Sequence, residues 1–80
     1  MTRDEALAWV ASVFDEPPSS VRLDTRRDEI AGWDSLGLLT LMADLDEKFQ
    51  IQLNEKEIRG LVSVKDVFVL LEQRGALSSQ

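Results

Sequence analysis

Ser35 stands between Asp34 and Leu36, at the point where a strongly apolar helical pattern begins. A serine hydroxyl becomes a nucleophile when a base activates it, and histidine is the usual base. The chain contains no histidine and no cysteine. It therefore cannot build a Ser–His or Cys–His pair, the common zinc ligand sets or a disulfide. We expect no catalytic residue in the chain, so any chemistry at Ser35 must be supplied by another molecule.

The position of Ser35 suits a phosphoester. Asp34 is a good N-cap, which places Ser35 in the first turn of the helix that follows. Backbone N–H groups in a first turn lack helical partners and the macrodipole there is positive, so a phosphate on this oxygen would gain a few tenths to about 1 kcal/mol. Serine is also common at helix starts for structural reasons alone, so an isolated Asp-Ser-Leu tripeptide does not decide between the two interpretations.

Charge and hydropathy exclude several classes of partner. The chain has 15 acidic and 9 basic residues and a formal net charge of -6. This balance disfavours nucleic acid and anionic membranes and favours partners with basic surfaces. The first residues do not resemble a signal peptide, and no apolar run approaches membrane-spanning length. We expect a cytoplasmic monomer with no membrane insertion.

Helical periodicity predicts an all-α fold in a single domain, 1–80: a four-helix bundle with a short third helix and a long loop between helices one and two. Capping-box spacing supports three of the helix starts, through Thr2 with Glu5, Asn54 with Glu57, and Ser63 with Asp66. The expected elements are a helix at about 2–14, a loop at 15–33, helices at about 35–49, 55–60 and 64–74, and a frayed tail at 75–80.

The apolar stripes of these helices predict the core. The expected core residues are Leu7, Val10, Ala11 and Phe14 in the first helix, Leu38, Leu41, Met42, Leu45 and Phe49 in the second, and Val64, Val67, Phe68 and Leu71 in the last. The long loop needs its own anchors, because a structureless connection of that length is uncommon in a compact domain. We expect Val21, Leu23 and Ile30 to provide them.

The long loop also carries a cluster of mixed charge. Its arginines lie among carboxylates: Arg22, Arg26 and Arg27 with Asp24, Asp28 and Glu29. The arginines suggest an anion site, whereas mixed charge of this kind is usually a solvated loop. Both interpretations stay open at this point.

Leu36, Leu39 and Ala43 form a second, partial stripe rotated away from the buried face of the same helix. They would face solvent unless a partner covers them or the long loop folds over them. An acidic rim surrounds them, made of Asp34, Asp44, Asp46 and Glu47. An apolar strip edged by carboxylates suits a basic partner surface, although acidic helices are often simply solvated.

A calcium loop is the one metal site that the carboxylate spacing suggests. Asp44, Asp46 and Glu55 stand at its positions one, three and twelve. Position five would be Lys48, a cation, and position six would be Phe49, where the sharp turn needs glycine. We therefore predict no metal site.

Taken together, the segments GWDSLGLLTLMADLDEKFQIQL, NEKEI and SVKDVFVLL resemble the acyl carrier protein family. Its members have Asp-Ser-Leu at the start of the second helix, an aliphatic stripe after it, an acidic residue before a phenylalanine, a short third helix and a capped fourth one. The resemblance covers Thr2 to about Gln73 and is strongest from Gly32 to Leu71.

The resemblance implies that Ser35 receives a 4'-phosphopantetheine arm from coenzyme A, added by a magnesium-dependent phosphopantetheinyl transferase. The thiol of the arm would carry acyl groups as thioesters. Asp34 matches the acidic neighbour that is associated with transferase recognition. The other partners implied are acyl-loading enzymes, synthases and acyltransferases with basic docking surfaces. The residues expected to recognise partners are Asp34, Leu36, Leu39, Ala43, Asp46, Glu47 and Glu55.

This chain departs from the common fatty-acid carriers at several positions. In those carriers the residues aligned with Gly37 and Thr40 tend to be acidic, and the residue aligned with Ala43 is often methionine. The run from Trp33 to Gly37 looks more like specialised carriers of lipid, polyketide or cell-surface pathways. Two alternatives remain. One is an aminoacyl or peptidyl carrier of a nonribosomal system, and the other is an unmodified helical module that binds a protein partner.

Overall fold

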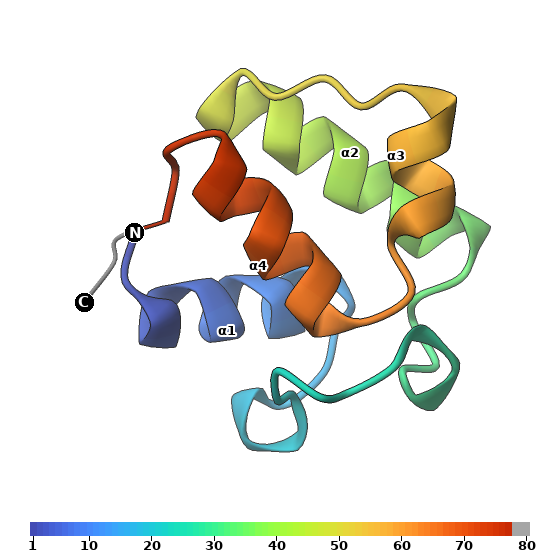
Figure 1. The fold of residues 1–80 in the computed structure, drawn as a ribbon. Coiled ribbons are helices and arrows are strands. Elements are labelled where there is room, and N and C mark those ends of the chain that lie inside the picture. The colour runs from blue at the N-terminus through green and yellow to red at the C-terminus, as the bar shows by residue number, and fades with distance from the viewer. Residues whose placement is uncertain (78–80) are drawn as a thin grey trace.

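Helices are the main elements of residues 1–77, which are the residues that the structure, a computed structural model, describes. The elements are α1 (Arg3–Val13), the short 3₁₀ helices η1 (Pro18–Ser20) and η2 (Arg27–Glu29), α2 (Ser35–Phe49), α3 (Glu55–Gly60) and α4 (Val64–Gln73). Figure 1 shows the short α3 joining α2 to α4, and the long connection between α1 and α2 that carries η1 and η2. The prediction of an all-α bundle with a short third helix and a long first loop is confirmed.

Side-chain caps explain where the four α-helices begin. Asp34 accepts a hydrogen bond from the backbone N–H of Gly37 at 2.9 Å and so caps α2. The other three begin with reciprocal capping boxes, formed by Thr2 with Glu5, Asn54 with Glu57, and Ser63 with Asp66. Each box satisfies two backbone N–H groups that the helix itself leaves free, a contribution of about 1 kcal/mol per cap. These caps are the ones that the sequence predicts.

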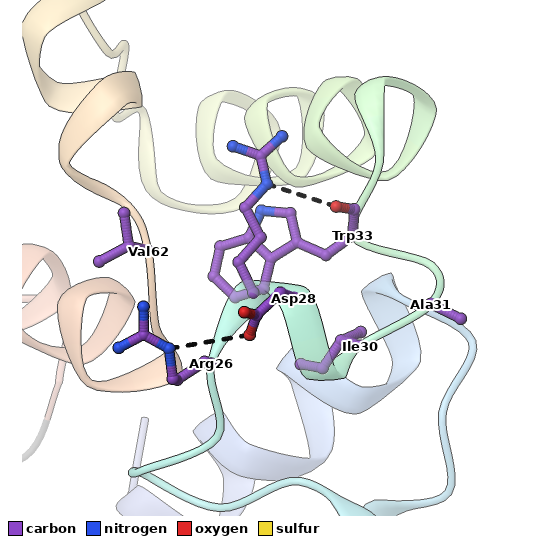
Figure 2. Close-up of a pocket in the computed structure, with 7 residues that line it drawn as sticks. Arg26, Asp28, Ile30, Ala31, Trp33 and Val62 are labelled. Atoms are coloured by element: carbon purple, nitrogen blue, oxygen red, sulfur yellow. Dashed lines mark hydrogen bonds and ion pairs between the residues drawn. The ribbon is translucent and has the colours of Figure 1, made fainter.

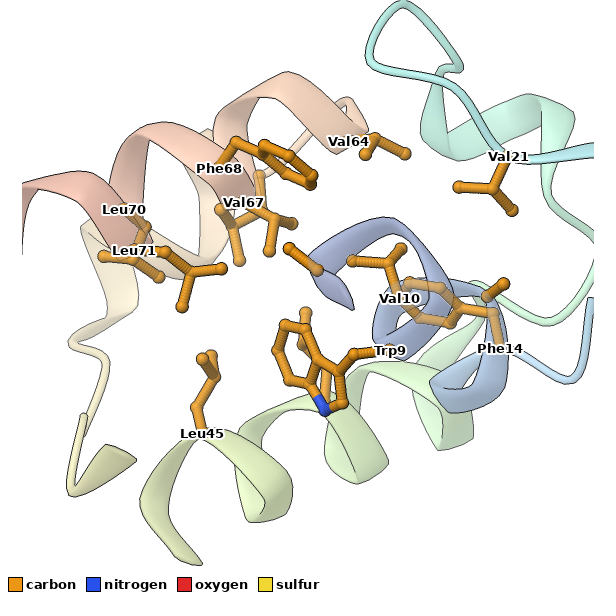
Figure 3. Close-up of a cluster of buried hydrophobic side chains, with 14 of the residues drawn as sticks. Trp9, Val10, Phe14, Val21, Leu45, Val64, Val67, Phe68, Leu70 and Leu71 are labelled. Atoms are coloured by element: carbon orange, nitrogen blue, oxygen red, sulfur yellow. The ribbon is translucent and has the colours of Figure 1, made fainter. Parts of the chain in front are cut away.

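The core lies between α1, α2 and α4. In Figure 3, Val10 of α1, Leu45 of α2 and Leu71 of α4 point into a shared interior, and all three are fully buried. Burying an aliphatic side chain of this size contributes about 1.5–3 kcal/mol. The predicted core omitted Trp9, which is 7% exposed and packs edge-on against Phe49, with ring centroids 5.5 Å apart.

The long loop is held by both side chains and backbone. Val21 and Ile30 are buried, as predicted, and Leu23 packs partly against the core. The loop also pairs with the start of α4 through three backbone hydrogen bonds, which run from Arg27 N to Val62 O, from Val64 N to Thr25 O and from Lys65 N to Leu23 O, at 2.9, 3.0 and 3.0 Å. These bonds satisfy loop groups that a helix or sheet would otherwise satisfy. No local pattern in the sequence predicts this pairing.

The expectation of a frayed tail is wrong for Ala76 and Leu77. Gly75 takes a left-handed φ of +72°, which ends the helix and turns the chain back. Ala76 N then donates to Leu71 O at 2.8 Å, and the ammonium group of Met1 donates to Ala76 O at 3.4 Å. The side chain of Leu77 is only 9% exposed. The rest of the predicted tail, 78–80, lies outside the described residues.

Candidate functional site

Ser35 is the first residue of α2 and its side chain is exposed. The preceding residue, Asp34, is extended, with φ -105° and ψ -166°, and its carboxylate reaches forward to the N–H of Gly37. The N–H groups of Ser35 and Leu36 come before that bond, in the turn where a helix cannot satisfy its own donors. The structure thus places an accessible hydroxyl at the positive end of a 15-residue helix.

Two glycines determine how closely the chain packs beneath this turn. A Cβ atom on Gly37 would overlap the carbonyl oxygen of Gly32, and a Cβ on Gly32 would overlap the carbonyl oxygen of Phe14. The end of α1, the loop and the start of α2 therefore meet backbone to backbone. In the sequence, the glycines at 32 and 37 are the only sign of this close approach.

Trp33 anchors the loop at the residue before the cap. Its indole is 3% exposed and stacks on the ring of Phe14, with centroids 4.6 Å apart and planes inclined by 14°. Stacked aromatic pairs contribute about 0.5–1.5 kcal/mol beyond the area they bury. Trp33 is not among the core residues that the helical stripes predict. Its burial fixes the approach of the chain to Asp34 and Ser35.

The outer face of α2 carries the predicted apolar strip. Leu36 and Leu39 are 73% and 61% exposed, and Ala43 is exposed as well. The alternative in which the long loop covers these residues is therefore wrong. Asp46 and Glu47 are exposed on the same helix. The strip and these carboxylates lie on one element, as a docking face requires.

Asp44 of the predicted rim and Glu55, a further residue predicted to recognise partners, both have partners within the chain. Asp44 accepts a hydrogen bond from Trp9 Nε1 at 3.0 Å and lies 3.9 Å from Lys48 Nζ, so it serves the packing of α1 on α2. Its place in the acidic rim is thus a misassignment. Glu55, on α3, forms an exposed ion pair with Arg59. The pair leaves Glu55 accessible but partly neutralised.

Two carboxylates that belong to helix capping boxes, Glu5 and Glu57, have shifted pKa values. The pKa of Glu5 is lowered, mainly because its carboxylate accepts the backbone N–H of Thr2. The pKa of Glu57 is lowered chiefly by the backbone N–H of Asn54; desolvation opposes this effect, and the hydrogen bond and charge of Arg74 lower the pKa further.

Residues 1–77 hold no group of three histidine, cysteine or acidic side chains arranged to bind a metal ion. None of the helices in those residues is long and apolar enough to cross a membrane.

The chain is similar to several curated proteins that carry the name acyl carrier protein. The one from Campylobacter concisus is 36% identical over 58 residues, which span 72% of this chain and 75% of that protein. The one from Campylobacter hominis is 38% identical over 55 residues, spanning 69% of this chain and 70% of its own. The one from Campylobacter curvus is 33% identical over 72 residues, spanning 90% and 94%. No family model matches the chain.

Proposed function

The chain belongs to the acyl carrier protein family, and from this premise we propose that it carries acyl groups on a 4'-phosphopantetheine arm attached to Ser35. The single observation that carries the proposal is the exposed hydroxyl of Ser35 on the first residue of α2, directly after the Asp34 cap. When bound, the arm supplies a thiol, which forms thioesters with acyl groups. The chain itself has no cysteine that could do so.

The residues around Ser35 fit an attached phosphate. The carboxylate of Asp34 accepts a hydrogen bond from the N–H of Gly37. The N–H groups of Ser35 and Leu36 are therefore left to donate to a phosphoester oxygen. In the transfer, the oxygen of Ser35 would form the new phosphoester bond. Its proton would pass to a base of the transferase, and the nucleotide part of coenzyme A would leave. This division of labour agrees with a chain that has no histidine.

The outer face of α2 would dock the carrier on its partner enzymes. Leu36 and Leu39 offer exposed apolar contacts, and Asp46 and Glu47 add negative charge beside them. Charge complementarity raises association rates with basic surfaces without demanding a tight complex. A carrier that visits several enzymes in turn benefits from contacts that form and break quickly. The full set proposed to recognise partners is Asp34, Leu36, Leu39, Ala43, Asp46, Glu47 and Glu55.

The pathway we propose is a specialised lipid, polyketide or cell-surface pathway. The packing at Gly37 supports it, because the carbonyl oxygen of Gly32 leaves no room there for the acidic side chain typical of common fatty-acid carriers. The fold around the start of α2 therefore depends on a residue by which this chain differs from them. A cytoplasmic location stays a prediction.

The test is incubation of the purified chain with coenzyme A, Mg²⁺ and a transferase of broad specificity, followed by mass spectrometry of the intact protein. We expect the mass to rise by one phosphopantetheinyl group. The Ser35→Ala variant should gain nothing, whereas Ser12→Ala, which removes an exposed hydroxyl from α1, should gain the full group. If a reference carrier gains the group in the same reaction and the wild-type chain does not, the result would favour the alternative, in which the chain is an unmodified module that binds a protein partner.

A further inference from the structure

Arg27 joins the long loop to the residue that precedes the Asp34 cap. Its Nε donates to the backbone oxygen of Trp33 at 3.4 Å, and Figure 2 draws this bond as the dashed line that ends at that oxygen. Its backbone N–H donates to the oxygen of Val62, in the segment before α4, at 2.9 Å. Arg27 therefore connects the entry of α2 with the entry of α4.

The backbone completes a closed ring between Arg27 and Trp33. The oxygen of Arg27 accepts a hydrogen bond from the N–H of Ile30 at 3.2 Å, and the oxygen of Ile30 accepts one from the N–H of Trp33 at 3.0 Å. The side chain of Arg27 then returns to the oxygen of Trp33 and closes the ring. The ring thus holds the chain from residue 27 to residue 33, which is two residues before Ser35.

The carbonyl group of Trp33 depends on the side chain of Arg27. The first turn of α2 does not use this oxygen, because the N–H of Gly37 donates to the carboxylate of Asp34 and the N–H of Leu38 donates to the backbone oxygen of Asp34. Among the hydrogen bonds of the described residues, Arg27 Nε is the only donor to the oxygen of Trp33. The bond is long, but its donor is charged, and charge-assisted hydrogen bonds are the stronger class.

Arg27 differs in this respect from the charged residues on either side of it. The side chains of Arg26 and Asp28 are 65% and 79% exposed, and they form an ion pair at 3.7 Å. Exposed pairs of this kind contribute little to stability. Arg26 and Asp28 thus fit the interpretation of a solvated loop, whereas Arg27 is half-buried and belongs to the structure at the start of α2.

A pocket of about 450 Å³ lies beside the ring, lined by loop residues 26–28, 30, 31 and 33 and by Val62. Figure 2 shows the indole of Trp33 extending from the start of α2 toward Val62. Side chains do not fill this hollow, so the loop and the segment before α4 gain less from packing there. The hydrogen bonds of Arg27 consequently matter more to the spacing of these two segments.

We propose that Arg27 is a positioning residue, which holds the first turn of α2, and with it Ser35, in place for modification. The proposal rests on the function proposed above, in which Ser35 receives the phosphopantetheine arm. By fixing the carbonyl group of Trp33, Arg27 sets the direction in which the chain enters the Asp34 cap. It thereby sets where the oxygen of Ser35 lies relative to a transferase that is docked on α2. A displacement of about 1 Å in a reacting group can cost about 100-fold in rate.

This role predicts a specific pattern in the kinetics of phosphopantetheine transfer. Arg27→Met removes the donor to the oxygen of Trp33, so we expect kcat to fall about tenfold. The KM for the carrier should stay close to the wild-type value, because the exposed docking residues Leu36 and Leu39 are unchanged. Arg27→Lys provides a donor again and should recover most of the loss. Arg26→Met, which changes the exposed neighbour, should leave both constants as they are in the wild type.

A second control separates positioning from a general loss of stability. Val67→Ala shortens a fully buried side chain of α4 and should lower the free energy of unfolding without lowering kcat. Thermal unfolding identifies a temperature at which every variant is folded, and the kinetics are measured there.

Hydrogen exchange adds a readout that needs no transferase. The N–H groups of Gly37 and Leu38 are the two that donate to Asp34. In Arg27→Met we expect both to exchange faster relative to the N–H groups of α4 in the same variant, because the turn opens locally. In Arg26→Met the ratio should be that of the wild type.

Four results would overturn the proposal. These are a kcat for Arg27→Met equal to that of Arg26→Met, a kcat for Arg27→Lys as low as that of Arg27→Met, an equal loss of kcat in Val67→Ala, and unchanged exchange at Gly37 and Leu38. If the wild-type chain gains no phosphopantetheine, the proposed function fails, and the exchange rates still decide whether Arg27 holds the turn. If the wild type is modified and Arg27→Met is modified just as fast, the carrier role stands and the positioning role fails.

Discussion

The carbonyl oxygen of Gly32 lies where a side chain on residue 37 would begin. This backbone approach joins the loop to the first turn of α2, directly beneath Ser35. Gly32 is itself pressed against the carbonyl oxygen of Phe14, at the end of α1. The position of the serine thus depends on contacts between the end of α1, the loop and the first turn of α2.

We predict that Gly37→Ala lowers the free energy of unfolding by about 1–3 kcal/mol, because the added methyl group must push two backbones apart. Urea denaturation followed by tryptophan fluorescence measures the change. Gly60→Ala is the matched control. Its Cβ would meet nothing within 4 Å at the end of α3, so it should be neutral or slightly stabilising. Equal effects of the two variants would contradict the packing described here.

Leu41 and Leu39 lie on opposite faces of α2 and should respond differently to truncation. Leu41 is fully buried, so Leu41→Ala should cost about 2–5 kcal/mol of unfolding free energy. Leu39 is 61% exposed, so Leu39→Ala should change stability by no more than about 0.5 kcal/mol.

The same Leu39→Ala variant tests the docking face. When the carrier concentration limits the reaction, the transferase should modify this variant more slowly than the wild type, because the variant loses an apolar contact with the transferase. Steady-state kinetics of the transfer measures this rate. An unchanged rate for Leu39→Ala and for Leu36→Ala would place the contact elsewhere.

Asp44→Ala should destabilise the protein by about 1–3 kcal/mol, because it leaves the Nε1 of Trp9 without an acceptor. Asp46→Ala removes an exposed carboxylate from the same helix and should change stability little. Thermal unfolding of the two variants compares them directly. Similar stabilities would mean that Asp44 is a surface residue after all.

Stability should also fall in acid through the Glu57 cap. The folded-state pKa of Glu57 is lowered, mainly by the backbone N–H of Asn54. A lowered pKa stabilises the fold above the pKa of the unfolded state, and this contribution is lost as the pH falls through the folded pKa. Glu57→Gln should therefore be less stable than the wild type at neutral pH and approach it in acid. Glu47→Gln, which changes a carboxylate outside any cap, should show no such convergence.

Most of the helical framework could be predicted from the sequence, since helix periodicity and caps such as Thr2 with Glu5 are local signals. The contacts that the sequence missed join distant segments. Trp9 reaches Asp44 across two helices, Trp33 stacks on Phe14, and Leu77 returns to the core. Such pairings depend on the packed geometry, which periodicity alone does not encode.

In the candidate site, too, the residues with local signals could be predicted, and the contacts between distant segments could not. Ser35 and Asp34 were identified from a capping position and a familiar tripeptide, and the exposure of Leu36 and Leu39 was one of two alternatives. The pocket beside Trp33 required the structure. That pocket lies between residues 26–33 of the loop and Val62, and these residues converge because the loop is hydrogen-bonded to the segment before α4.

The most direct test is the mass of the native chain isolated from cells that contain an active phosphopantetheinyl transferase, with peptide fragmentation to locate any added group. The account predicts one phosphopantetheinyl group on the oxygen of Ser35. A chain recovered without modification from such cells, or a group located on another residue, would contradict it.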